Sequence, residues 1–126
     1  MRANINLTVY ENADYRQGFI WKTGQEETPV DLTGWSAEMQ IRSSPVGDVI
    51  LELTTDNGGI EIANQLTDKG RYDLIISAED TDGICPDHRD RTAVYDLFLI
   101  SDSGERRLHQ YGHVTFVAAV TREVTT

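Results

Sequence analysis

The sequence has little of what covalent cross-linking or membrane insertion requires. Its 126 residues include one cysteine, Cys85, which excludes an intramolecular disulfide and is compatible with synthesis in a reducing cytoplasm. No apolar run approaches the roughly 20 residues of a membrane-spanning helix, and the first residues, through Leu7, lack the apolar core of a secretory signal. We therefore expect a protein that is made in the cytoplasm and has no membrane partner.

Positive charge is also scarce. The chain carries 11 lysines and arginines against 21 acidic residues, a formal net charge of -10. Such a surface repels both a phosphate backbone and an anionic membrane. This balance argues against a nucleic-acid partner and favours a partner protein with a basic surface.

Motifs for catalysis or cofactor binding are missing. There is no Gly-x-Ser-x-Gly elbow and no glycine-rich loop between a strand and a helix, and Cys85 has no cation placed to lower its pKa. His109 and His113 are four residues apart around a glycine, so we interpret them, with His88, as surface histidines near loop ends and not as a zinc site. We predict a protein that is not an enzyme and has no cofactor.

A group of aspartates between residues 80 and 90 resembles a calcium loop only in composition. It lacks the sixth-position glycine and the closing glutamate of an EF-hand, and two arginines compete for its carboxylates. A solvated acidic loop is the favoured interpretation, so no metal site is predicted.

What the sequence does contain is alternation. From Trp35 to Arg42, apolar and polar side chains alternate, which is typical of a half-buried β-strand. Similar runs occur near residues 5–10, 15–22, 49–53, 60–62, 72–76, 92–100, 105–111 and 114–120, with a bend or bulge expected at Gly112 between the last two. We expect the runs at 5–10 and 15–22 to form a hairpin, and turn signals at 43–48, 56–59 and 101–104 to reverse the chain.

These strands predict an all-β, two-sheet antiparallel β-sandwich, immunoglobulin-like in architecture. We assign residues 1–126 to one domain, with a short polar tail from residue 121 and one short helix or 3₁₀ turn near residues 77–83. The predicted core residues are Trp35, Met39, Tyr95 and Phe116.

The strand at residues 92–100 is apolar on nearly both faces, so its outer face is covered either by a second core layer or by a neighbouring subunit. The candidate subunit-interface residues are Ile20, Ile75, Phe98 and Ile100. Trp21 is the one aromatic side chain that the alternation leaves available as a sugar-stacking platform.

Several motifs occur in an order that resembles a known group of proteins. They include Tyr10 to Tyr15, the Pro-Val-Asp-Leu-Thr-Gly segment ending at Gly34, Asn57 to Ile60, Ile76 to Thr81, Val94 to Leu97, and Gly112 to Val114. Together they resemble small bacteriophage virion proteins with an immunoglobulin-like sandwich, and are similar to the N-terminal domain of the phage baseplate upper protein. The similarity covers residues 7–122, and no fibre, coiled coil or receptor-binding domain accompanies it.

The resemblance implies a scaffold, made in the host cytoplasm and localised to the virion, that docks onto other phage structural proteins. We expect it to act in several copies, as a homo-oligomer, at the tail, baseplate or neck. Two alternatives remain open: a capsid decoration protein, and a carbohydrate-binding module that holds host-surface glycans through Trp21.

Overall fold

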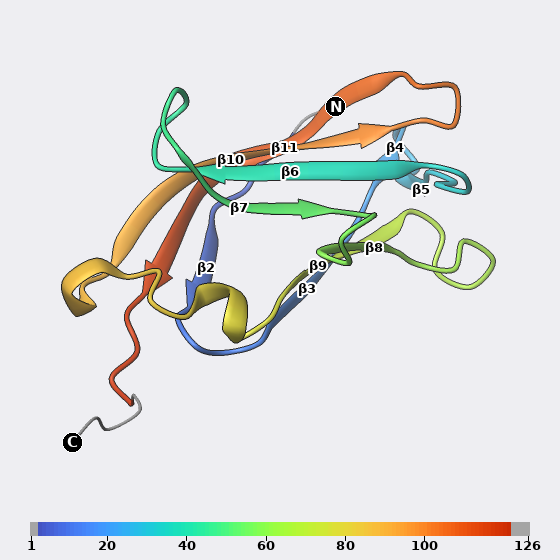
Figure 1. Cartoon of the computed structure of the whole chain (residues 1–126). Helices are drawn as coiled ribbons and strands as arrows, with labels where there is room; N and C mark the ends of the chain where they lie inside the picture. Colours follow the sequence, from blue (N-terminus) through green and yellow to red (C-terminus); the bar gives the residue numbers. More distant parts are fainter. Residues whose placement is uncertain (1–2, 122–126) are drawn as a thin grey trace.

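The computed structural model describes residues 3–121, in which a large and a small β-sheet pack face to face (Figure 1). The large sheet has the order β1-β11-β10-β6-β7, and β2 also pairs with β11. The small sheet has the order β3-β9-β8. The predicted all-β sandwich is therefore confirmed, while the immunoglobulin-like label stays a prediction.

The strands of the large sheet are β1 (Ala3–Asn4), β2 (Leu7–Tyr10), β6 (Ser36–Arg42), β7 (Val49–Thr54), β10 (Arg91–Ile100) and β11 (Arg106–Val117). Those of the small sheet are β3 (Tyr15–Ile20), β8 (Ile60–Ile62) and β9 (Arg71–Ile76). A two-stranded ribbon joins β4 (Lys22–Thr23) to β5 (Thr28–Pro29). Unlike the predicted sheets, the large sheet is mixed, because β1 and β2 run parallel to β11.

The core lies between the sheets and follows the alternation of the strands. Met39 in β6, Tyr95 in β10 and Phe116 in β11 are all buried. Trp35 is only partly buried, because it precedes β6 on the tight turn around Gly34. Trp21 is the more deeply buried tryptophan, and its ring meets that of Trp35 edge to face at 5.5 Å.

Two of the predicted reversals are hairpins within one sheet. The turn at residues 43–48 joins β6 to β7, and the turn at 101–104 joins β10 to β11. The predicted hairpin of residues 5–10 with 15–22 is wrong: β2 pairs with β11, whereas β3 pairs with β9 in the other sheet. The turn at 56–59 likewise passes from β7 in the large sheet to β8 in the small one.

The segment between β9 and β10 carries two 3₁₀ turns, η1 (Glu79–Thr81) and η2 (Pro86–His88). The first lies within the predicted residues 77–83, and the second was not predicted. Thr81 is fully buried and its hydroxyl accepts a hydrogen bond from the Asn12 N–H at 2.9 Å, which fixes η1 against the β2–β3 turn. The predicted polar tail lies outside the described residues from position 122 onward.

A chain of hydrogen bonds crosses the core and links three parts of the fold. The Tyr72 hydroxyl in β9 donates to Gln110 Oε1 in β11 at 2.7 Å. Gln110 Nε2 donates to the Tyr95 hydroxyl at 2.8 Å, and this hydroxyl donates to the Ile5 carbonyl at 2.6 Å. Because Gln110 is 1% exposed, these bonds satisfy polar groups that water does not reach.

A β-bulge in β11 makes this arrangement possible. Leu97 pairs with Gln110 but the next residue, Phe98, pairs with Leu108, so His109 is the extra residue. Its ring lies 5.0 Å from that of Trp21, and burial lowers the pKa of His109 to about 4. The prediction of a surface histidine is therefore wrong at this position, whereas His88 and His113 are exposed.

Candidate functional site

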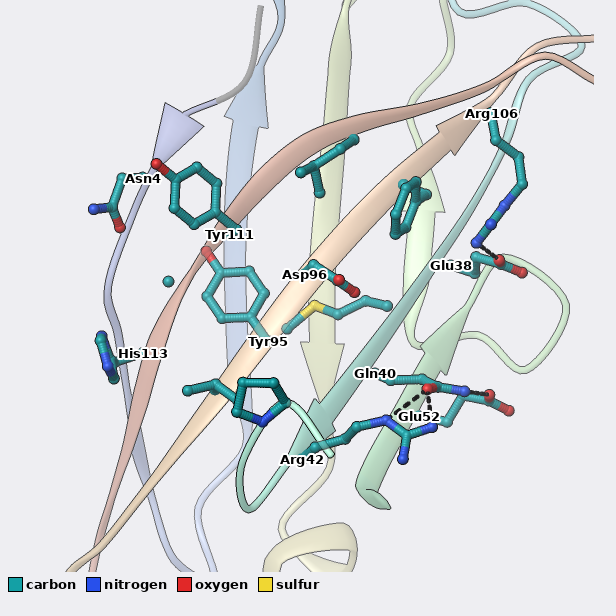
Figure 2. A pocket seen from close by; sticks show the side chains of 16 residues that line it. Asn4, Glu38, Gln40, Arg42, Glu52, Tyr95, Asp96, Arg106, Tyr111 and His113 are labelled. Atoms are coloured by element: carbon teal, nitrogen blue, oxygen red, sulfur yellow. Dashed lines mark hydrogen bonds and ion pairs between the residues drawn. The ribbon is translucent and has the colours of Figure 1, made fainter. Parts of the chain in front are cut away.

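A depression lies on the outer face of the large sheet, opposite the core (Figure 2). It is a groove of about 650 Å³ along β10, with β6 on one side and β11 on the other. Figure 2 shows Asp96 between a polar group at Arg42, Gln40 and Glu52 and the ring of Tyr111. The groove forms because the residues that alternate with the core residues of these strands meet here.

The strand register places five polar residues in one row across the groove. Gln40 lies opposite both Glu52 and Asp96, Asp96 lies opposite Tyr111, and Tyr111 lies opposite Asn4. On one side of this row, Phe98 lies between Glu38 and Leu108. On the other side, Val94 lies between Arg42 and His113.

Most charged groups of the groove have a hydrogen-bond or ion-pair partner within it. Arg42 donates to Gln40 Oε1 through two nitrogens, at 2.7 and 3.0 Å, and to the Gly47 carbonyl at 2.8 Å. Gln40 Nε2 donates to Glu52 at 3.0 Å, and Arg106 is paired with Glu38. Within residues 3–121, the Asp96 side chain has no hydrogen-bond or ion-pair partner. The resting groove therefore presents one unpaired carboxylate.

The floor of the groove is apolar. Val94, Phe98 and Leu108 are half-buried, and Tyr111 is 38% exposed. The Arg106 guanidinium lies over the Phe98 ring, 4.2 Å from its centroid, which is a cation–π contact. This floor is accessible to a partner without any rearrangement of the core.

The four predicted interface residues do not form one surface. Phe98 and Ile100 lie on the outer face of the large sheet, beside the groove. Ile20 and Ile75 lie on the outer face of the small sheet, on the opposite side of the molecule. A single apolar patch of all four residues is therefore excluded, because their strands belong to different layers.

The outer face of the small sheet is dominated by an ion-pair cluster. The buried carboxylate of Asp73 accepts from Arg16 Nε and Arg71 Nε, both at 2.9 Å. The Arg71 hydrogen bond, more than any other cause, lowers the pKa of Asp73. The charged groups of this face are paired with one another, whereas the groove contains a carboxylate without a partner. This face is therefore a weaker candidate for binding than the groove.

Several groove residues were not among the sequence-based candidates. Asp96 lies within the predicted strand at residues 92–100 but is not a predicted site residue, and neither are Arg106, Leu108 and Tyr111. The usable signal was the alternation of β10, which places Asp96 between Val94 and Phe98 on the same face. The bulge at His109 hid the contribution of β11, because it breaks the alternation.

Trp21 does not provide a sugar-binding platform. It is 7% exposed, and its ring packs against Trp35 and His109. A sugar ring needs the open face of an aromatic side chain. The carbohydrate-binding alternative therefore loses the residue on which it depended.

Cys85 is buried near Glu11, whose carboxylate accepts from the Cys85 N–H at 2.9 Å. Burial is the main cause that raises the pKa of the Cys85 thiol, and the charges of Glu11 and Asp90 add to it. The thiol is thus held in its neutral, weakly nucleophilic form.

Among the described residues, no group of three or more His, Cys, Asp or Glu side chains is arranged to hold a metal ion. Within residues 3–121, no helix has the length and hydropathy to cross a membrane. No model of a known protein family matches the sequence, and a search of curated proteins returns no match.

Proposed function

We propose that the chain is a non-enzymatic structural protein of a bacteriophage particle, which docks onto another virion protein through the groove on its large sheet. It acts in several copies at the tail, baseplate or neck. We also propose that its sandwich is immunoglobulin-like. The sequence motifs from Tyr10 to Val114 support the phage assignment. The groove supports the docking role.

One observation supports docking most directly: the floor of Val94, Phe98 and Leu108 is apolar, while the charged side chains around it, except Asp96, are already hydrogen-bonded within the groove. A protein interface has this composition, with an apolar centre and a polar rim. Burying a charged side chain that already has a hydrogen-bond partner costs less free energy than burying one without a partner, because the partner remains when water leaves. Covering this face therefore releases apolar surface from water, and Asp96 is the one carboxylate of the groove that needs a new partner when this happens.

The experiment uses two matched substitutions on opposite faces of the sandwich. Phe98→Asp places a carboxylate on the groove floor beside Arg106, and Ile20→Asp places one on the small sheet, where Ile20 is 53% exposed. We expect both variants to keep the fold, measured by circular dichroism and thermal melting. Only Phe98→Asp is expected to be absent from purified phage particles, measured by mass spectrometry.

Normal incorporation of a folded Phe98→Asp variant would show that the groove is not the docking face. Absence of the wild-type chain from purified particles would overturn the virion role itself. A density map of the particle separates the tail, baseplate or neck position from the capsid decoration alternative by where the chain is found.

A further inference from the structure

The unpaired carboxylate of Asp96 restricts what covers the groove. We infer that the partner contributes an extended basic segment that lies along β10, with a lysine or arginine against Asp96 and apolar side chains against Val94 and Phe98. This inference rests on the proposed docking function and names the chemistry of the partner.

The first step is the desolvation of Asp96. Val94 and Phe98 flank it on the same face of β10, so a partner that covers these two residues also removes water from the carboxylate. A carboxylate taken out of water without a cation or strong donors is strongly destabilising. A stable complex therefore needs strong hydrogen-bond donors against Asp96, and a positive group supplies them together with the opposite charge.

The second step is that neither arginine of the groove is free to supply this group. Arg42 is held by Gln40 and the Gly47 carbonyl, and Arg106 is held by Glu38 above the Phe98 ring. Gln40, which lies opposite Asp96, uses its amide on Arg42 and Glu52. The positive group must come from the partner.

The third step concerns which chain the partner is. Two copies of this protein each carry a formal charge of -10 and repel each other. A symmetric contact through the groove would also bring two Asp96 carboxylates to one small area. A different, basic chain is electrostatically favoured, and its attraction to this acidic protein accelerates the encounter.

The fourth step is the shape of the segment. Val94, Asp96 and Phe98 follow one another at alternate positions along β10, in the order apolar, acidic, apolar. An extended chain presents every second side chain to one side, at a similar spacing of about 6 to 7 Å. A segment with apolar, basic and apolar residues at alternate positions therefore matches the groove residue for residue.

The experiment is a competition for incorporation into particles. Wild type and a variant carry different tags, are produced together, and their ratio in purified particles is divided by their ratio in the lysate. Asp96→Asn removes the charge and Asp96→Leu replaces it by an apolar group. Asp82→Asn is the matched control, because Asp82 is an exposed acid outside the groove. Equal melting temperatures verify that all the variants are folded.

We expect Asp96→Asn to be under-represented at least about 10-fold and Asp96→Leu more strongly, because each leaves the partner's cation buried without its counter-ion. Asp82→Asn is expected to compete equally with wild type. If Asp96→Asn and Asp96→Leu enter particles as well as wild type while Phe98→Asp is excluded, the docking face stands and the basic segment is refuted. If Phe98→Asp also enters normally, the docking function itself fails.

Loss of the Asp96 variants together with normal entry of Phe98→Asp would overturn both the docking face proposed above and the placement of the segment along β10, because the partner would then bind Asp96 without covering the groove floor.

Discussion

Replacing Gln110 by leucine tests whether the buried hydrogen bonds hold the two sheets together. The substitution removes the acceptor of the Tyr72 hydroxyl and the donor to the Tyr95 hydroxyl. Tyr95 still donates to the Ile5 carbonyl, whereas Tyr72 is completely buried and its hydroxyl has no other hydrogen-bond partner among the described residues. The main cost is therefore one unsatisfied buried hydroxyl.

An unsatisfied buried hydroxyl costs about 1 to 3 kcal/mol, and the leucine side chain recovers part of this through its apolar surface. We expect Gln110→Leu to lower the free energy of unfolding by about 2 kcal/mol, or roughly 8 °C in melting temperature for a domain of this size. The assay is urea unfolding, followed by the fluorescence of Trp21 and Trp35, which changes when the core opens.

The control is a double-mutant cycle with Tyr72→Phe. Tyr72→Phe removes the hydroxyl that Gln110→Leu leaves without an acceptor. The double variant is therefore expected to lose less unfolding free energy than the sum of the two single losses, by at least about 1 kcal/mol. A single variant within about 0.5 kcal/mol of wild type, or strictly additive losses, would refute the structural role of the Tyr72–Gln110 bond.

Three further predictions concern stability. Gly112→Ala is expected to cost about 2 kcal/mol in urea unfolding, because the added Cβ would overlap the Ile5 carbonyl oxygen; unchanged stability would contradict this close approach. Burial lowers the pKa of His109 from 6.5 to about 4, so the folded state favours the neutral imidazole. The resulting contribution to stability, between about 1 and 3 kcal/mol, is complete above pH 6.5 and is lost as the pH falls toward 4. A pH series of thermal melts on His109→Gln is expected to lose this slope, whereas His113→Gln keeps it. Asp73→Asn is expected to cost about 1 to 2 kcal/mol at neutral pH. Because the folded pKa of Asp73 is below 3.8, the difference from wild type shrinks as the pH falls below that value; a constant difference would exclude its ion pairs as the cause.

Alternation and turn chemistry were sufficient to predict the fold class. The inward faces of β6 and β10 follow directly from the spacing of Met39 and Tyr95, and the turns at 43–48 and 101–104 join neighbouring strands as their glycines suggest. These are local properties, since a side chain's face depends on its neighbours in the same strand.

The assignment of strands to sheets was not predictable in the same way. Asn12 has a positive φ of 63°, and the turn around it carries the chain from β2 in one sheet to β3 in the other. A reversal signal in the sequence is the same whether the following strand pairs with the preceding one or crosses the core. The failed hairpin prediction and the split of Ile20 from Phe98 have this common cause.

The candidate site depended on pairing register, which the sequence does not contain. Asp96 gains its significance from Gln40 and Tyr111 on the neighbouring strands, and the bulge at His109 sets the position of Tyr111 in that row. A single inserted residue changes which side chains meet across a sheet. The groove was therefore visible only once three strands were placed together.

The most direct measurement of the docking role is hydroxyl-radical footprinting of the chain free in solution and within purified particles. The groove predicts that Phe98, Leu108 and Tyr111 are labelled in the free protein and protected in the particle, while Ile20 on the opposite face labels more than these three in the assembled state. Equal labelling of Phe98, Leu108 and Tyr111 in both states would contradict burial of the large sheet's outer face on assembly.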